Sequence, residues 1–355
     1  MVILVTSRIT GRGGRETVIS RLLPEISRRG TRVLLAMLDN ADDPAWAASL
    51  PPVLRIASID PAVAIKRHLI ATIRFIRDTL RASGADVVVA TEPLAFPIIR
   101  LASLWLGSRR PAILSWFHAD IRFLRHTWAV RFCDGHLAIS EGIADQVKHR
   151  WRQPISVIYN PFDADDIQPC PRPARDSDVH LLFIGRLHEQ KCADRILTAL
   201  SKVRATNWRL QIVGDGPELG QLRLLADTLQ LSHRIIWSGW SVAPWACVES
   251  ASLLLLTSRM EGFPLVLVEA LARGVPLAAM DCDFGPREVI QRGRNGWLLP
   301  QGDVESLARL IDSLCNGEIQ LPPEASVIAT VERFRVSTVV SSFLKAANEA
   351  CGRLA

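Results

Sequence analysis

The chain has 355 residues, of which 48% are apolar and 22% charged, and its formal net charge is +6. This length suits two domains, and the composition is that of a folded globular protein, which excludes extensive disorder. No run reaches the roughly 18 apolar residues of a transmembrane helix, so we expect no membrane span.

The positive charge lies in the first half of the chain. Residues 1–170 hold 22 Lys and Arg against 16 Asp and Glu, and the remaining residues hold 20 of each, out of totals of 42 and 36. A basic half suits an anionic membrane, an acidic substrate or a nucleic acid. A nucleic-acid binder would interleave its cations with aromatic residues, whereas the tryptophan-rich segment Trp237–Trp245 lies in the neutral half. We therefore expect no nucleic-acid partner.

Seven cysteines are scattered along the sequence without a Cys-x-x-Cys pair. This pattern predicts reduced thiols in the cytoplasm and neither a disulfide framework nor a zinc site.

The first half alternates short apolar runs with amphipathic stretches. Several of the runs are continuously apolar, which favours strands buried on both faces of a parallel sheet. Strands are expected at Val2–Thr6, Arg32–Met37, Val87–Ala90, Ala112–Ser115, Gly135–Ile139 and Ser156–Ile158, and helices at Glu16–Arg28, Val63–Ala82 and Gly142–Arg150.

A proline-rich linker at residues 160–173 interrupts this alternation, which then restarts. The sequence thus predicts an α/β fold with two Rossmann-like doubly wound domains, 1–165 and 166–334, and a C-terminal helix at about 335–355 packed back on the first. Strands are expected at His180–Ile184, Arg209–Val213, Ile235–Trp237, Leu253–Thr257, Leu277–Met280 and Gly296–Leu299, and helices at Ala193–Val203, Pro217–Leu229, Pro264–Arg273, Arg287–Gln291 and Val304–Leu314.

Two loops after predicted strands suit an anion. Gly13 and Gly14 follow the first strand, where a glycine turn lets a ligand approach a helix N-terminus, although the dinucleotide fingerprint is absent. Gly185-Arg186 and Lys191 follow the strand His180–Ile184, and a guanidinium and an ammonium there would bind a diphosphate. A tight turn and two solvated loop cations are the alternative interpretations.

Two carboxylates, Glu261 and Glu269, stand eight positions apart around a Gly-Phe-Pro turn. Glu269 falls among apolar residues of a predicted helix, so it needs donors such as sugar or ribose hydroxyls, or else a buried arginine. Trp240 could stack on a base and His118 could present a nitrogen to a ligand, but each is as readily a structural residue. Asp281-Cys282-Asp283 fits a metal-binding Asp-x-Asp string, and we interpret it as a loop.

The stretch Ile65–Arg81 predicts a helix with an apolar face and a cationic face. Such a helix can lie on an anionic membrane, or it can pack its apolar stripe on the sheet.

Taken together, these motifs resemble the retaining GT-B glycosyltransferases of family 4. The carboxylate pair Glu261 and Glu269 matches the family's Glu-x7-Glu signature. The loop that contains Arg186 resembles the family's diphosphate-binding loop, and Gly13-Gly14 resembles the family's N-terminal glycine loop. The segments Gly13–Ser20, Ser115–His118, His136–Ser140 and Trp237–Trp245 are similar to members that act on the lipopolysaccharide outer core.

The resemblance implies two domains that face a cleft, a UDP-sugar donor and no metal or other cofactor. It implies Glu261, His118, Arg186 and Lys191 as catalytic residues, with the two cations on the diphosphate. It implies Glu269 on the ribose, Val213 and Trp240 at the uracil, and Gly13, Gly14, Gly262, Phe263 and Val266 near sugar and phosphate.

The implied reaction moves a hexose, galactose from UDP-galactose, onto a glucose of the lipopolysaccharide outer core, at the cytoplasmic face of the inner membrane. The first alternative is a family 4 transferase with UDP-glucose or another donor and a different acceptor. More remote alternatives are a UDP-sugar epimerase and a non-enzymatic anion-binding protein.

Overall fold

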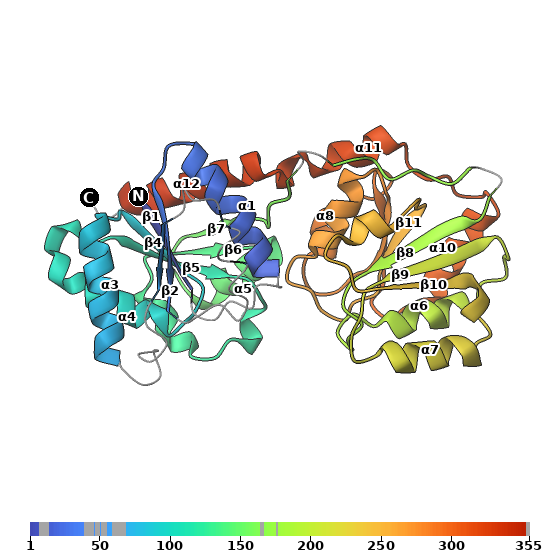
Figure 1. Ribbon diagram of the computed structural model, residues 1–355, viewed down its shortest axis with the longest axis horizontal. Helices are drawn as coiled ribbons and strands as arrows, with labels where there is room; N and C mark the ends of the chain where they lie inside the picture. Colours follow the sequence, from blue (N-terminus) through green and yellow to red (C-terminus); the bar gives the residue numbers. More distant parts are fainter. Residues whose placement is uncertain are drawn as a thin grey trace. The chain divides into compact units, whose positions relative to one another are not determined.

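A computed structural model describes the chain except residues 7–13, 39–45, 47–49, 51–54, 59–68, 164–166, 175–176 and 353–355. It divides into two compact units, Met1–Asp163 with Phe334–Ala355, and Ala164–Arg333 (Figure 1). The expected boundaries at 165 and 334 lie close to these limits. Each unit is an α/β layer structure with its own parallel sheet.

In the described part of the first unit, seven parallel strands are ordered β3-β2-β1-β4-β5-β6-β7. All five residues of β1 and of β2 are buried, because helices cover both faces of the sheet. The strands are β1 Val2–Thr6, β2 Val33–Met37, β3 Arg55–Ser58, β4 Val87–Ala90, β5 Ala112–Phe117, β6 Gly135–Ala138 and β7 Ile155–Val157.

Strand β3 was missed by the sequence analysis. It lies at the edge of the sheet and carries Arg55, so it lacks the continuous apolar run that marked the central strands. Strand β5 continues two residues beyond the expected end at Ser115, because Trp116 and Phe117 are also buried in the sheet.

Helices surround this sheet, and the C-terminal helix α12 lies beside α1 in Figure 1. Arg29 fastens the two, since its guanidinium donates to Ser341 Oγ and to the Ser337 carbonyl, both at 2.8 Å. The helices are α1 Gly14–Arg28, α3 Leu69–Ser83, α4 Ala95–Ser103, α5 Glu141–Arg150 and α12 Val336–Gly352, with 3-10 turns η2 Leu104–Arg109, η3 Ile121–Phe123 and η4 Thr127–Phe132.

The described part of the predicted basic helix is α3. Its residues Thr72, Ile76 and Leu80 are buried, while Arg74 and Arg81 are exposed. Ile76 and Leu80 of the predicted apolar stripe therefore pack into the unit, whereas Leu69 is exposed, and residues 65–68 lie outside the described residues. No described helix of the chain is both long enough and apolar enough to cross a bilayer.

His136 is a buried histidine of β6, with its Nδ1 2.7 Å from Ser115 Oγ and its ring packed near Phe117 and Trp151. Burial lowers its pKa from the ordinary 6.5 to about 4. The unfolded chain therefore binds a proton that the native state excludes as the pH falls from 6.5 towards 4.

We expect the free energy of unfolding to fall over that pH window by up to about 1.4 kcal/mol per pH unit from this residue. Urea unfolding at a series of pH values checks this. His136→Asn should be less stable at neutral pH but should show a shallower pH dependence. Equal slopes for the two proteins would contradict the assignment.

The second unit has six parallel strands in its described part, ordered β10-β9-β8-β11-β12-β13. Its apolar core joins β8, β9 and β11 to α6, α7 and α10, and α8 packs on β11 and β12. The strands are β8 Val179–Ile184, β9 Trp208–Val213, β10 Ile235–Gly239, β11 Leu253–Leu256, β12 Leu277–Met280 and β13 Gly296–Leu299. The helices are α6 Ala193–Leu200, α7 Leu219–Thr228, α8 Leu265–Ala272, α9 Pro286–Val289, α10 Val304–Cys315 and α11 Glu324–Ile328, with 3-10 turns η5 Ser232–Arg234, η6 Pro244–Cys247 and η7 Ala329–Phe334.

Candidate active site

The loops that leave β8, β9 and β10 are joined at the carboxyl edge of the second sheet. The amide of Gly185 donates to the Val213 carbonyl at 3.0 Å, and the amide of Gly214 donates to Gly239 at 2.8 Å. A Cβ at Gly214 would lie 1.9 Å from the carbonyl oxygen of Gly185. The contact therefore requires glycine and brings the backbones close together at the edge where doubly wound sheets bind ligands.

The β8–α6 loop carries both predicted phosphate-binding cations. Arg186 is exposed, and Lys191 stands directly before Cys192, which precedes α6. Cys192 adopts the left-handed conformation at φ 47°, ψ 48°, which is uncommon for a residue with a side chain. The turn directs the chain into α6, whose N-terminal amides add a positive partial charge beside Lys191.

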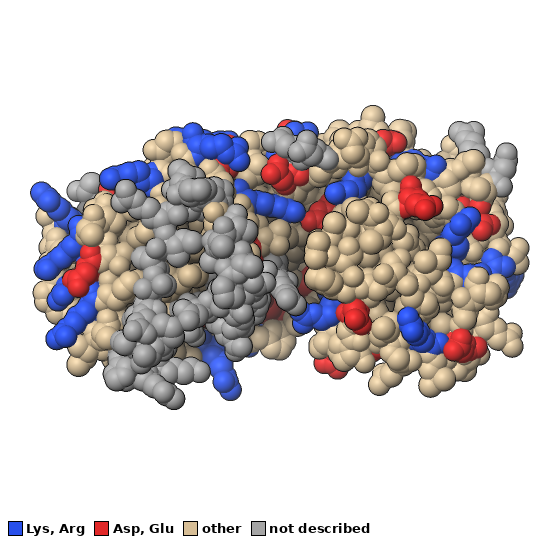
Figure 2. All heavy atoms as spheres, in the orientation of Figure 1, with Lys and Arg blue, Asp and Glu red and all other residues tan. Residues whose placement is uncertain are grey.

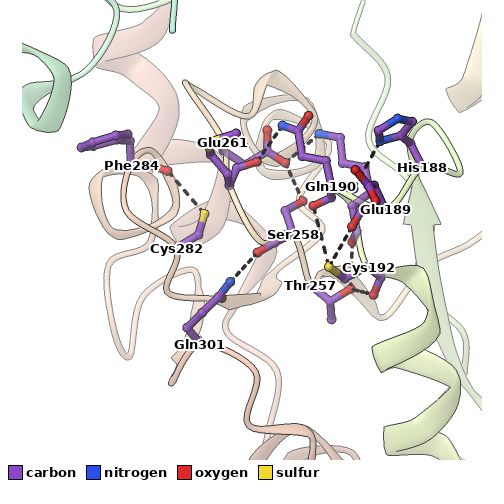
Figure 3. A network of polar contacts seen from close by, with 12 residues as sticks. His188, Glu189, Gln190, Cys192, Thr257, Ser258, Glu261, Cys282, Phe284 and Gln301 are labelled. Carbon is purple, nitrogen blue, oxygen red and sulfur yellow. Dashed lines mark hydrogen bonds and ion pairs between the residues drawn. The ribbon is translucent and has the colours of Figure 1, made fainter. Parts of the chain in front are cut away.

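Lys191 and Glu261 form an ion pair, although they are far apart in the sequence. Lys191 Nζ lies 2.6 Å from Glu261 Oε1, and Ser258 Oγ donates to the same oxygen at 2.6 Å (Figure 3). The Glu261 side chain is 7% exposed and that of Lys191 is 25% exposed. The buried carboxylate thus has a counter-ion and a hydroxyl donor, as a buried charge requires.

Further hydrogen bonds hold the loop after β11 against the β8–α6 loop, as Figure 3 shows. Thr257 Oγ1 donates to the Cys192 carbonyl at 2.8 Å, and the Gln190 side chain donates to the Met260 carbonyl at 2.8 Å. Gln301 donates to the Ser258 carbonyl at 3.1 Å from the loop before α10. These contacts fix the positions of the cationic loop and of Glu261 relative to each other.

Glu269, on α8, is half-buried beside an aromatic side chain. Trp245 Nε1 donates to its Oε2 at 3.4 Å, and the Arg273 guanidinium lies 4.6 Å from the centroid of the Trp245 ring. Arg273 also donates to the Glu269 carbonyl at 2.9 Å. The indole therefore orients this carboxylate, and the guanidinium packs against the indole.

The turn between the two carboxylates is pressed against the loop before α9. Gly262 and Val266 are half-buried and Phe263 is 6% exposed. Gly285 has φ +90°, and a Cβ there would lie 2.4 Å from Pro264 Cδ. The backbone from 262 to 266 is therefore held in place at the end of β11.

The two predicted uracil residues have different environments. Val213 ends β9 and is 1% exposed as a whole residue, and its carbonyl accepts from the Gly185 amide. Trp240 directly follows β10 and is 62% exposed. An exposed indole at the carboxyl edge of the sheet suits stacking on a base.

Three of the predicted residues belong to the first unit. His118 follows β5, with its ring centroid 4.5 Å from that of Trp116. Gly13 lies outside the described residues, and Gly14 is the first residue of α1.

The Asp-x-Asp string forms a loop after β12. Arg287 binds Asp281 through two hydrogen bonds of 2.9 and 3.0 Å. Burial and then the nearby Glu261 carboxylate raise the pKa of the Cys282 thiol to about 12, so this thiol stays protonated. Among the described residues, no group of three or more His, Cys, Asp and Glu side chains could hold a metal ion.

The arrangement therefore presents an exposed guanidinium, an ammonium, a helix N-terminus and two oriented carboxylates at one edge of one sheet. The cations and amides suit a phosphate or diphosphate, and the carboxylates suit hydroxyl groups.

Comparison with known proteins identifies the class of enzyme. A family model described as glycosyl transferases group 1 matches residues 168–329, and one described as glycosyltransferase family 4 matches residues 12–166. The chain is a family 4 glycosyltransferase of the GT-B fold. The predicted family and GT-B fold are thereby confirmed, as is the prediction that the chain is a glycosyltransferase.

This glycosyltransferase is similar over nearly its whole length to lipopolysaccharide 1,6-galactosyltransferases. It is 29% identical to that of Salmonella typhimurium over 346 residues and 28% identical to that of Escherichia coli over 344 residues, with 94% of each chain covered. A solved structure of the outer core galactosyltransferase WaaB superposes with a TM-score of 0.85 at 28% identity, covering 98% of this chain and 99% of the other. Anabaena HepE in complex with UDP, at 19% identity and TM-score 0.78, shares the fold.

The glycosyltransferase contains site residues that the sequence analysis missed. Ser258 and Trp245 donate to the predicted carboxylates, and Arg273 donates to the main-chain carbonyl of Glu269. None of the three carries a motif of its own. Trp245 belongs to the tryptophan-rich segment, but nothing in the sequence pairs it with Glu269.

A cavity of about 450 Å³ lies elsewhere in the second unit, beside Arg172, Asp178 and Ser252. Val179, which begins β8, also lines it, as does Ser252 immediately before β11. It is therefore at the amino edge of the sheet, opposite the edge where ligands of such sheets bind.

Proposed function

We propose that this glycosyltransferase moves galactose from UDP-galactose onto a glucose of the lipopolysaccharide outer core, with retention of configuration and without a metal ion. The supporting observation is the pairing of Lys191 with Glu261 beside Arg186, in a chain similar end to end to 1,6-galactosyltransferases. UDP-glucose or another donor with a different acceptor is the alternative.

In this proposal Arg186 and Lys191 bind the diphosphate. Breaking the donor bond leaves negative charge on the departing UDP, and fixed cations and helix amides stabilise that charge. Lys191 is already held by Glu261 at 2.6 Å, so the donor meets a positioned ammonium. The diphosphate would share this cation with the carboxylate.

Glu261 would accept hydrogen bonds from hydroxyls of the donor sugar, since Ser258 and Lys191 orient its carboxylate. The acceptor would attack from the face that the diphosphate leaves. His118 would lie beside the sugar and Gly13-Gly14 near the phosphates, as the family resemblance implies.

Glu269 would bind the ribose hydroxyls, and Trp240 with the Val213 backbone would flank the uracil. The backbone of Gly262, Phe263 and Val266 would approach sugar and phosphate. In this proposal the enzyme acts at the cytoplasmic face of the inner membrane, on a lipid-borne acceptor.

Release of UDP measured with a panel of UDP-sugars, with and without lipopolysaccharide truncated before the outer-core galactose, tests the proposal. We expect acceptor-dependent release to be highest with UDP-galactose. Higher acceptor-dependent release with UDP-glucose would contradict the donor assignment, and release independent of every acceptor would contradict the transfer reaction.

Trp245 provides a separate test of the ribose role of Glu269. Trp245→Phe keeps an aromatic ring but removes the donor to Glu269 Oε2. We expect KM for the UDP-sugar to rise by roughly tenfold, equivalent to about 1.4 kcal/mol, with little change in kcat. Steady-state kinetics with the UDP-sugar and its 2′,3′-dideoxyribose analogue measure this.

The dideoxy analogue should be affected far less by the substitution, because it lacks the hydroxyls that Glu269 would bind. Trp237→Phe is the matched control, since that indole lies on β10 and contacts Arg223 rather than Glu269. An equal rise in KM for both donors would show that Trp245 acts on another part of the nucleotide.

A further inference from the structure

The exposed large apolar side chains of the first unit all fall within one stretch of its described residues, from α3 to η4. They are 41% to 68% exposed and comprise Leu69, Ile70, Leu94, Leu101, Leu104, Trp105, Phe123 and Trp128. Single exposed apolar residues are ordinary, but a concentration of them over neighbouring elements marks an interaction surface.

Helix α4 is apolar on both of its sides. Phe96, Ile99 and Ala102 are buried in the unit, while Leu101 on the helix and Leu104 just after it are exposed. A surface helix normally turns polar residues to solvent. The solvent-facing side of α4 therefore has the apolar composition of a surface that another molecule covers.

The elements that carry these residues are packed together. Helix α4 contacts α3 and η4 and runs directly into η2. Arg100 fastens α4 to the end of η4, since its guanidinium donates to the Phe132 carbonyl at 2.8 Å and pairs with Asp134 at 2.7 Å. Trp128 meets the Phe132 ring edge-on at 6.2 Å, and the Arg131 guanidinium lies 5.7 Å from the Trp128 ring.

Arginines accompany the apolar residues. Between Leu69 and Phe132 the sequence has nine arginines, no lysine and four acidic residues. Figure 2 shows cationic side chains gathered at the end of the unit that holds α3 and α4. Three exposed arginines follow the exposed tryptophans in the sequence: Arg109 and Arg110 after Trp105, and Arg131 after Trp128 on η4.

We propose that this α4 surface binds the headgroup region of an anionic lipid bilayer. It consists of Leu101, Leu104, Trp105, Arg109, Arg110, Trp128 and Arg131. Tryptophan prefers the membrane–water interface, leucine inserts among the acyl chains near it, and arginine binds lipid phosphates. The inference deepens the proposed function by naming the surface through which the enzyme meets its lipid-borne acceptor.

Charge disfavours a second copy of the chain as the occupant. A symmetric dimer through this surface would bring two arginine-rich patches together, and like charges across an interface repel. The surface also differs from the predicted basic helix. Helix α3 buries Ile76 and Leu80 of its predicted apolar stripe and presents exposed arginines beside α4.

Flotation of the full chain with vesicles tests the proposal, without donor or acceptor. Vesicles of phosphatidylcholine with phosphatidylglycerol are compared with pure phosphatidylcholine. We expect binding to the anionic vesicles that weakens with added salt. Because transfer is not assayed, a failure here leaves the transferase proposal standing, and a failure of transfer leaves this one standing.

Two double variants locate the surface. Leu104→Ser with Trp105→Ser should lower the partition coefficient about tenfold, and Arg109→Gln with Arg110→Gln should lower it by roughly fivefold for each arginine. The matched control is Arg223→Gln with Leu224→Ser on α7 of the second unit, where both residues are exposed, and it should bind as the native chain does.

Circular dichroism establishes that each variant is folded, which these exposed positions favour. Binding of both surface variants at the native level would overturn the proposal, and so would equal binding to neutral and anionic vesicles. A native dimer that the Leu104→Ser, Trp105→Ser variant converts to a monomer, with no vesicle binding, would show that a second copy covers the surface instead.

Discussion

Replacing Lys191 with methionine is expected to lower kcat by roughly 10² to 10³-fold, the loss that follows removal of one charge-stabilising group from a transition state. The ammonium is a quarter exposed and bonded to Glu261 at 2.6 Å, so it is positioned before the donor binds. UDP release at saturating donor and acceptor measures the effect. Methionine keeps the length of the side chain and removes its charge.

The same substitution leaves the Glu261 carboxylate with Ser258 but without its cation, so it should also lower the free energy of unfolding, by about 2 kcal/mol. Rates are therefore compared at a temperature where circular dichroism shows the variant folded. Lys202→Met is the matched control, because that lysine pairs with Glu305 at 2.7 Å on the surface of the same unit. Near-native turnover of folded Lys191→Met would remove the diphosphate role.

Gly214→Ala is expected to destabilise the second unit by about 3 kcal/mol, the cost of a serious overlap in packed structure. The new Cβ would lie 1.9 Å from the Gly185 carbonyl oxygen, which is a backbone atom and cannot rotate away, so the β8 and β9 loops must separate. Urea unfolding followed by circular dichroism measures the change. UDP affinity should fall with it, since Arg186 follows Gly185 directly.

Gly220→Ala is the control for that experiment. Gly220 lies in α7, and a Cβ there has no neighbour within 4 Å. Alanine favours a helix over glycine, so this variant should be as stable as the native chain or up to about 1 kcal/mol more stable. Equal stability of the two glycine variants would contradict the close approach of the loops.

The sequence was most informative where a strand is buried on both faces. The continuous apolar runs of β1 and β12 gave the bounds that the structure has. Strand β3 was missed because an edge strand with Arg55 lacks such a run. Helix α4 was missed because it is apolar on its buried and exposed sides alike, which removes the helical period from its sequence.

The candidate site was predictable as a set of residues but not as a set of contacts. Motifs brought out Lys191 and Glu261 separately, and their ion pair joins positions 70 residues apart. The contact of Trp245 with Glu269 similarly depends on how η6 and α8 pack. The Asp281-Cys282-Asp283 string matches a metal-binding motif in the sequence, but the structure pairs the Asp281 carboxylate with Arg287 at the surface.

A crystal structure of the protein with UDP tests the central claim most directly. We predict diphosphate oxygens within about 3 Å of Lys191 Nζ and the Arg186 guanidinium, with the ribose hydroxyls on Glu269. UDP bound instead in the cavity beside Arg172, at the opposite edge of the sheet, would contradict the account.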